Sequence, residues 1–290
     1  MSIAMDAACL QCALRRNLET VQPLGTPEET MEFARDLMRL YLDGPRDVPS
    51  TWFTPKISQL LHDRYGLEID RFRQEKLDSN KLVLSHMADI RQRVREAENP
   101  ILAGLRYAIL GNYLDFSALQ GQISFETFTK MLDTAHEIQF DMAVFGRFCQ
   151  DLEKGKNLLY LTDNAGEIGF DRIFAETISA KYPNIGITFC VRGGPVLNDA
   201  TREDAKAMGI PYRVIDNGNL IPGTQLDQLG AEAKQALEEA DVILAKGMAN
   251  VETMLGCGYN IYYAFLVKCQ RFVNLFGQPM MTPMLVSEVP

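Results

Sequence analysis

The chain has 290 residues, of which 47% are hydrophobic and 23% are charged, and its formal net charge is -9. This is the composition of an ordinary globular protein with one large core or two closely packed ones. The acidic balance argues against nucleic acid or an anionic membrane surface as the main partner, because both require clustered Lys and Arg. It does not exclude a small anionic substrate, since a bound metal ion can outweigh the overall charge locally.

The first residues lack the basic segment that begins a secretory signal. The least charged stretches, 253–267 and 272–287, are too short to span a bilayer and contain Gly, Asn or Pro. We therefore expect a cytoplasmic protein whose six cysteines stay reduced.

The first half of the chain predicts one helix after another. Thr26 and Pro27 supply the N-cap and first position of a helix, and Gly44-Pro45 ends its apolar pattern. No β-rich run precedes residue 156. Further helices are expected to begin at Thr54-Pro55 and to cover about 70–97, 100–111, 124–134 and 137–154.

The second half alternates short apolar runs with helical stretches, which is typical of βαβ units and a parallel sheet. We therefore expect an α/β fold, in which a helical region, 1–155, packs on a doubly wound, mostly parallel, Rossmann-like three-layer region, 156–290. The expected strands are 158–161, 187–191, 212–215 and 242–245, with 262–267 and 284–286 as further candidates, and the expected helices lie near 167–181, 200–208 and 227–239.

Three of the expected strands end in unusual polar segments: 162–167 (TDNAGE), 192–201 (RGGPVLNDAT) and 246–252 (KGMANVE). Ligands of open α/β sheets bind outside the carboxyl ends of the strands. Asp and Asn offer hard oxygen ligands for a cation such as Mg²⁺ or Mn²⁺, and a Lys offers positive charge for phosphate. Gly166 lets the backbone approach a ligand, and the N-terminus of the following helix favours an anion. Together the segments predict metal-dependent hydrolysis of a phosphate ester.

Each segment alone also has a plain structural explanation. Asp163–Glu167 can be a turn with a helix N-cap, and Asn198–Thr201 can cap the next helix. Lys246 at the end of a buried strand is harder to explain without a partner for its charge. Because all three segments occur at strand ends, their combination favours a functional site.

These three segments, together with Cys9-x-x-Cys12 and the block 111–115 (GNYLD), resemble the domain of unknown function 89 family. Members of that family are metal-dependent damage-control phosphatases, also called acidic-residue-methyltransferase-like proteins. The N-terminal features resemble its stand-alone prokaryotic branch. The likeness covers nearly the whole chain, and the ordered set of motifs is specific.

The resemblance implies that Asp163, Asn164 and Asp199 hold a divalent metal ion, which in this family is Mn²⁺, Co²⁺, Ni²⁺ or Mg²⁺. Asp163, Asp199 and Glu167 would be catalytic, with Glu167 orienting water or a substrate hydroxyl, and Lys246 would bind the phosphate. Further candidates for substrate contacts are Asn112, Asp115, Arg192, Asn198 and Asn250.

The family acts on small phosphorylated metabolites: sugar phosphates, phosphopantetheine-type compounds or nucleotides. Many relatives carry a second glycine where this chain has Met248-Ala249, a departure expected to narrow the pocket or shift its specificity. The expected reaction is direct hydrolysis, in which the cation bridges phosphate and water and a carboxylate takes the proton of the water. The sequence does not indicate which carboxylate is the base. A covalent aspartyl-phosphate on Asp163 is less favoured, because a carboxylate committed to a metal is a poorer nucleophile.

Cys9 and Cys12 lie one helical turn apart, so their thiols can share a face. A zinc site needs about two more ligands, and only the distant Cys257 and Cys269 are candidates. Reduced structural thiols, a redox pair and a metal site all stay open. The histidines lack the spacing of a metal motif and are expected at the surface or in packing: His62, His86 and His136.

Two other functions also stay open. A carboxylate methyltransferase is an activity claimed for some relatives, but no glycine-rich adenosylmethionine loop, dinucleotide motif or P-loop motif is present. The non-enzymatic alternative is a sugar-phosphate-binding sensor that keeps the site without turnover. Metal-dependent release of phosphate from p-nitrophenyl phosphate distinguishes the enzyme from the sensor. The sequence indicates no particular oligomeric state.

Overall fold

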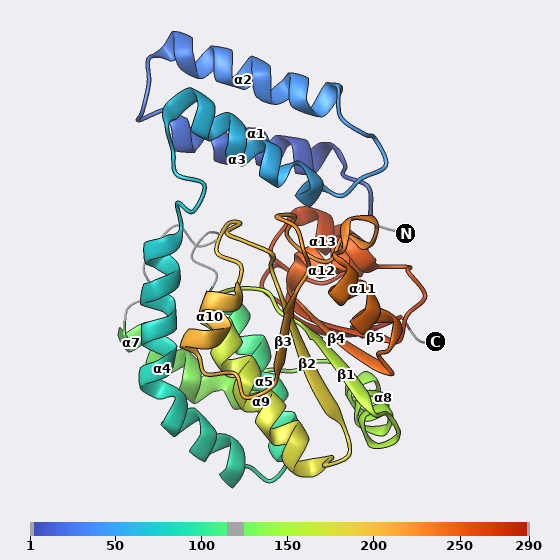
Figure 1. The fold of residues 1–290 in the computed structure, drawn as a ribbon. Helices are drawn as coiled ribbons and strands as arrows, with labels where there is room; N and C mark the ends of the chain where they lie inside the picture. The colour runs from blue at the N-terminus through green and yellow to red at the C-terminus, as the bar shows by residue number, and fades with distance from the viewer. Residues whose placement is uncertain (1–2, 115–124, 289–290) are drawn as a thin grey trace.

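The computed structural model of the chain describes residues 3–114 and 125–288 (Figure 1). Seven helices of the described residues precede the first strand: α1 (Ala7–Val21), α2 (Pro27–Leu42), α3 (Thr54–Tyr65), α4 (Arg73–Glu96), α5 (Pro100–Gly111), α7 (Phe125–Thr134) and α8 (Met142–Lys154). The strands are β1 (Asn157–Leu161), β2 (Gly186–Val191), β3 (Arg213–Asp216), β4 (Val242–Lys246), β5 (Ile261–Leu266) and β6 (Pro283–Ser287). Between them lie α9 (Glu167–Lys181), α10 (Arg202–Ala207), α11 (Ala231–Glu238), α12 (Gly247–Met254) and α13 (Gln270–Phe276).

The six strands form one sheet in the order β3-β2-β1-β4-β5-β6. The first five are parallel, and β6 pairs antiparallel with β5 at the edge. The strand order reverses next to β1, so the connections leave from opposite sides of this strand. The structure confirms the expected α/β fold with a mostly parallel sheet.

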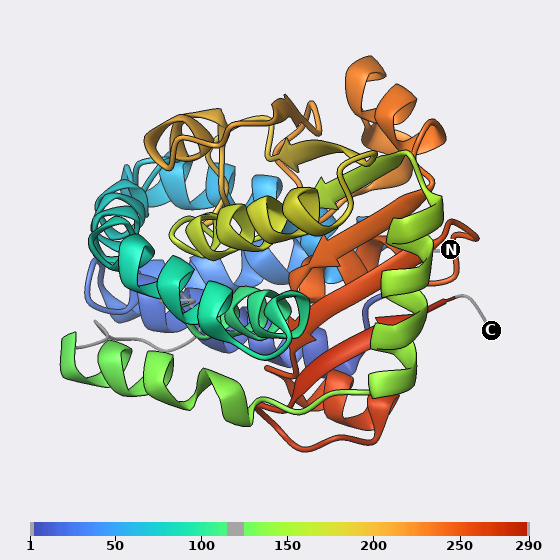
Figure 2. The same cartoon turned by 90° about the horizontal axis from the view of Figure 1, so that it is seen from below.

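Helices cover both faces of the sheet, which gives three layers (Figures 1 and 2). Side chains alternate along a strand, so Leu158 and Tyr160 of β1 face one way and Leu159 and Leu161 the other. The first pair joins a core with α4, α5, α8 and α9, and the second pair joins a core with α11, α12 and α13. Helices that precede residue 155 and strands that follow it therefore share one core.

The first three helices pack against one another around a smaller core of their own (Figure 1). The helix α2 begins with the expected cap: Thr26 accepts from the Glu29 backbone N–H, and the Glu29 carboxylate accepts from that of Thr26. The buried residues of this core are Val21, Phe33, Leu37, Phe53, Ile57 and Leu61.

All six strands lie within one residue of the expected boundaries. The helix α8 begins later than expected, because Asp141 caps it and residues 135–137 form a separate 3-10 turn. The short helices α12 and α13 were not expected, since their few residues show too little periodicity. Asp115 lies outside the described residues. None of the helices in the described part of the chain is long and apolar enough to cross a membrane.

Candidate active site

The turn after β1 joins the strand to α9 through Gly166. This residue has a φ of +75°, and a Cβ there would lie 2.0 Å from the Ser79 hydroxyl oxygen, so only glycine fits. The Gly166 N–H donates to Asn80 Oδ1 at 2.7 Å. The turn that carries Asp163 and Asn164 is therefore held from outside by the helix α4.

The loop after β2 lies directly against this turn. The Ala165 N–H donates to the Asn198 carbonyl at 2.9 Å, and the Ala200 N–H donates to the Asp163 carbonyl at 2.8 Å. Asn164 and Asp199 pair as an isolated antiparallel bridge. Leu197, one residue before Asn198, has a φ of +46°, which bulky residues rarely adopt. The backbone thus joins the two segments that the sequence places about 35 positions apart, at the cost of local strain.

The turn after β4 forms another side of the same site. Gly247 has a φ of +77°, and a Cβ at this position would lie 2.0 Å from Asp163 Oδ2. The carboxylate of Asp163 therefore rests against the bare backbone of Gly247. All three polar segments predicted at strand ends meet here.

Hydrogen bonds from amides and a guanidinium orient the carboxylates. Asp163 Oδ2 accepts from Asn112 Nδ2 at 2.8 Å and from Asn164 Nδ2 at 2.9 Å. Asp199 Oδ2 accepts from Arg192 Nε at 2.5 Å. Because the Asn164 nitrogen is committed to carboxylates, its Oδ1 atom is the part of the amide that remains for a cation. Two carboxylates and one amide oxygen form a donor set that suits a hard divalent cation.

The sheet buries a charge cluster directly behind these groups. Lys246 and Glu167 are both 0% exposed, and the Lys246 ammonium donates to Glu167 Oε1, to Asp171 Oδ1 and to the Ala108 carbonyl, each at 2.7 Å. Tyr160 also donates to Asp171 Oδ1, at 2.7 Å. The three hydrogens of the ammonium group are therefore all used within the protein.

The buried charges shift one another's protonation. Burial raises the pKa of Asp171 to about 6, with Lys246 opposing the shift and Glu167 adding to it. Burial alone lowers the pKa of Lys246, but the carboxylates of Asp171 and Glu167 outweigh this and raise the pKa above its ordinary value. The ammonium is thus kept charged by its partners.

Glu167 connects this cluster to the cavity side of the site. Its Oε2 atom accepts from Asn112 Nδ2 at 2.9 Å and from Asn164 Nδ2 at 2.8 Å. Glu167 therefore fixes the two amides that orient Asp163. Neither of its carboxylate oxygens faces open space.

A cavity of about 850 Å³ opens over the strand ends. The helices α1 and α3 form its opposite wall, together with the connection between α3 and α4. Of the residues expected in the site, five line this cavity: Asn112, Asp163, Asn164, Asn198 and Asp199.

The other expected site residues that the structure describes lie behind the cavity wall. Lys246 and Glu167 belong to the buried cluster, and Arg192 reaches Asp199 and the Thr162 carbonyl. Asn250, also 0% exposed, donates to the carbonyls of Thr162 and Lys246. These four side chains support the residues that line the cavity and do not themselves form its surface.

The thiols of Cys9, Cys12 and Cys269 line the same cavity, and all six cysteines are free. Across residues 3–114 and 125–288, no group of three or more His, Cys, Asp or Glu is arranged to hold a metal ion. In the described chain, Arg271 Nη1 contacts Cys9 Sγ at 3.3 Å.

Sequence reasoning missed Asp171 and the cationic residues of the helical wall. Asp171 follows Glu167 by one helical turn, and this i, i+4 pair of acids in a largely apolar helix was a usable signal. Arg71 carried no comparable signal, because it lies in a polar connection far from the motifs. Its position at the cavity follows only from the packing of the helices.

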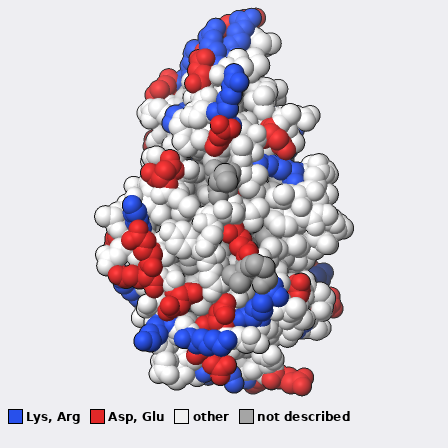
Figure 3. All heavy atoms as spheres, turned by 90° about the vertical axis from the view of Figure 1, so that its right-hand side faces the viewer, with Lys and Arg blue, Asp and Glu red and all other residues white. Residues whose placement is uncertain are grey.

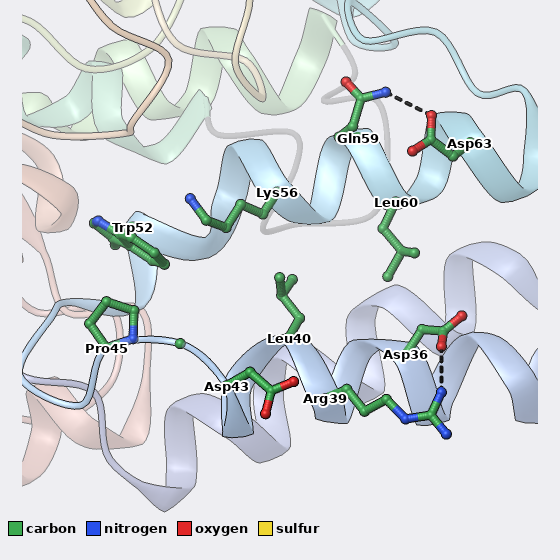
Figure 4. A pocket seen from close by; sticks show the side chains of 11 residues that line it. Asp36, Arg39, Leu40, Asp43, Pro45, Trp52, Lys56, Gln59, Leu60 and Asp63 are labelled. Carbon is green, nitrogen blue, oxygen red and sulfur yellow. Dashed lines mark hydrogen bonds and ion pairs between the residues drawn. The ribbon is translucent and has the colours of Figure 1, made fainter.

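A second cavity, of about 540 Å³, lies between α2 and α3 (Figure 4). The Lys56 ammonium lies 3.7 Å from the centroid of the Trp52 ring, and Gln59 donates to Asp63 at 2.7 Å. No residue of the polar strand-end segments lines it.

The chain matches known proteins over nearly its whole length. Residues 5–283 match the family model described as Damage-control phosphatase ARMT1-like domain. An uncharacterized protein of Methanocaldococcus jannaschii is 31% identical over 293 residues, covering 95% of this chain and 93% of that protein. A damage-control phosphatase of Archaeoglobus fulgidus is 30% identical over 226 residues, covering 77% of each chain.

A damage-control phosphatase of Pyrococcus horikoshii is 33% identical over 204 residues, covering 69% of this chain and 68% of that one. The crystal structure of a DUF89 family protein from Pyrococcus horikoshii superimposes with a TM-score of 0.84 at 25% identity, covering 98% of this chain and 99% of the other. The resemblance found in the sequence is confirmed. The chain therefore belongs to the damage-control phosphatase ARMT1-like family, a family of phosphatases.

Proposed function

We propose that this protein hydrolyses phosphate monoesters of small metabolites, using a divalent cation held by Asp163, Asn164 and Asp199. The observation that carries the proposal is the direct pairing of the first two strand-end loops, which brings these three residues to one wall of the cavity. Family membership supports the reaction class. Sugar phosphates, phosphopantetheine-type compounds and nucleotides are the substrate types we propose, and Mn²⁺, Co²⁺, Ni²⁺ or Mg²⁺ is the proposed metal.

When bound, the cation would polarise the phosphoryl group and lower the pKa of a coordinated water. Asp163 and Asp199 supply the negative charge that attracts the cation, and Asn112 and Arg192 orient these carboxylates. Asn198 lines the cavity, which supports a role for it in contacting the substrate.

Lys246 takes a different role in this proposal from the phosphate contact that the resemblance implied. Its ammonium is fully buried and bonded to three acceptors, so it stabilises Glu167 instead of touching the substrate. Glu167 then holds Asn112 and Asn164 against Asp163. The proton acceptor for the water is accordingly one of the carboxylates on the cavity wall.

The test is hydrolysis of p-nitrophenyl phosphate with each of the four metals. We expect Asp163→Asn and Asp199→Asn to lower metal-stimulated turnover by at least about a hundredfold, because each removes a charged ligand. Asp133→Asn changes an exposed carboxylate that pairs with Arg93 far from the cavity, and serves as the matched control. Calorimetric titration with Mn²⁺ should show weakened metal binding in the two site variants.

Undiminished turnover in either site variant, with an intact fold by circular dichroism, would contradict the ligand assignment. If the wild-type protein binds metal and phosphate but no phosphomonoester is turned over, the protein is a sensor instead of an enzyme. Chelation with EDTA followed by metal restoration separates loss of the cation from loss of the fold.

A further inference from the structure

The cavity over the strand ends is lined by more cationic than acidic side chains. Five of the residues that line the cavity are Lys or Arg, and four are Asp or Glu, whereas acids outnumber bases in the chain as a whole, 38 to 29. On the outer face seen in Figure 3, acidic and basic side chains are interspersed. Since Asp163 and Asp199 are two of the four acids, a bound divalent cation would leave the cavity positive. The five cationic residues are Arg15, Arg16, Arg71, Lys268 and Arg271.

Two of these cationic side chains already have partners within the protein. Arg271 is 7% exposed and contacts Glu252 and the N-terminal segment. Arg15 forms an exposed ion pair with Glu19, one turn along α1, at 3.2 Å. Neither is placed primarily for a ligand.

Arg71 differs from both. It precedes α4, its guanidinium lies 5.0 Å from the Phe72 ring centroid, and both residues line the cavity. Its Nη1 atom is buried and has no hydrogen-bond partner within the described residues. No carboxylate of the described chain forms an ion pair with it. Because the guanidinium of Arg71 lines the cavity without an anionic partner in the described chain, an anion that enters the cavity can pair with it.

Two further observations agree with an anion at this wall. Burial lowers the pKa of the Arg71 guanidinium, and the nearby positive charge of Arg16 lowers it further, so the two charges repel one another. Thr51, from the turn before α3, also lines the cavity, and its hydroxyl is buried without a partner in the described structure. An anionic group here would relieve the repulsion between the two guanidinium groups.

We infer that Arg71 binds a second anionic group of the substrate, at the helical wall, while the phosphate to be hydrolysed binds at the strand ends. The natural substrate is then a phosphorylated metabolite with a carboxylate or another phosphate remote from the reacting ester. This substrate class rests on the proposed phosphatase function. The anion site itself rests on the cavity and on Arg71.

Two matched substrates test the specificity. Glucose 6-phosphate and 6-phosphogluconate both carry a phosphate at C6, but only the second has a carboxylate at the other end. We expect the metal-loaded wild-type protein to favour 6-phosphogluconate by about tenfold or more in kcat/KM, mainly through KM, because one charge-assisted contact is added. Arg71→Gln should abolish the preference, Arg71→Lys should keep part of it, and the control Arg213→Gln, at an exposed residue that does not line the cavity, should leave it unchanged.

A binding measurement separates this inference from the proposed function. Inorganic phosphate is titrated calorimetrically into EDTA-treated protein, where the strand-end carboxylates without a cation repel it. We expect binding by the wild type and about tenfold weaker binding by Arg71→Gln. If no substrate is hydrolysed but this difference is found, the proposed function fails and the anion site stands.

Three results would overturn the inference. These are equal hydrolysis of both substrates by the wild type, equal impairment of both by Arg71→Gln, and phosphate binding to the metal-free protein that does not depend on Arg71. Thermal unfolding of each variant verifies that the fold is kept, and the Arg71→Lys variant retains a cation if Arg71→Gln does not fold.

Discussion

Lys246, fully buried at the end of β4, shows how a charged group inside a protein is held by partners from another element. A charged group at the end of a central strand needs partners, and Lys246 finds Glu167 and Asp171 on α9. These partners lie one helical turn apart on the face of α9 that packs on the sheet. The ammonium and the two carboxylates therefore form a buried support on which the amides of the site are fixed.

We predict that Lys246→Met destabilises the protein by about 3–5 kcal/mol, because it leaves two buried carboxylates without a cation. Urea unfolding monitored by circular dichroism measures the loss. The matched control is Lys234→Met on the exposed face of α11, which should change the free energy of unfolding by less than about 0.5 kcal/mol. Equal stabilities of the two variants would show that Lys246 is not an essential partner of the carboxylates.

At the scale of elements, the β4–α12 turn links the sheet to the site through a single glycine. Gly247 needs a positive φ so that the chain can leave the strand and start α12 at once. The same residue leaves room for the Asp163 carboxylate, which a side chain would displace. The position of one proposed metal ligand thus depends on the backbone of another element.

We predict that Gly247→Ala lowers both stability and metal-dependent turnover, because it adds a clash with Asp163 to the strain of the positive φ. Gly258→Ala is the matched control, since Gly258 has a φ of +84° but nothing within 4 Å of an added Cβ. Gly258→Ala should lower the free energy of unfolding by about 1 kcal/mol, which is the cost of the positive φ, and should leave the activity unchanged. Urea unfolding and p-nitrophenyl phosphate hydrolysis are the measurements. If both variants lose the same stability and keep the same turnover, the close approach of Gly247 to Asp163 does not affect stability or activity.

At the scale of the whole molecule, the helices α1–α3 and the sheet each have a core, and the cavity lies where they meet. Few polar contacts join them. Ser50 Oγ donates to Glu252 Oε2 at 2.8 Å, and the Ile3 N–H donates to the Glu252 carbonyl at 2.8 Å. Arg271 of α13 donates to the Ala4 carbonyl. The N-terminal helices therefore depend on a small set of contacts around α12 and α13.

We predict that Arg271→Ala loosens α1–α3 while the sheet stays intact. Hydrogen exchange followed by mass spectrometry should show faster exchange in residues 7–65 than in the wild type, with β1 and β4 unchanged. The reason is that the lost contacts with Ala4, Asp6 and Cys9 join α13 to the N-terminal segment. Arg213→Ala, which removes an exposed ion pair with Glu232, is the control and should leave exchange in α1–α3 unchanged. Faster exchange spread evenly over the sheet would contradict this account.

Local sequence pattern was enough to predict the order of the six strands and of the longer helices, and the sheet edge at which the polar segments meet. Short apolar runs separated by helical stretches predict a parallel sheet, and the carboxyl ends of parallel strands share one edge. For that reason Asp163, Asp199 and Lys246 could be assigned to one region without a structure. The six strand boundaries were right because buried strands are bounded by polar turns.

Which of these groups face the cavity and which lie behind it depends on long-range packing. The side chain of Lys246 turns toward α9 because Glu167 and Asp171 are there, and no local pattern around residue 246 states this. Arg71 reaches the cavity because α1–α3 pack over the strand ends, a long-range contact between residues distant in the chain. Local periodicity specifies elements, whereas burial and charge pairing depend on what those elements pack against.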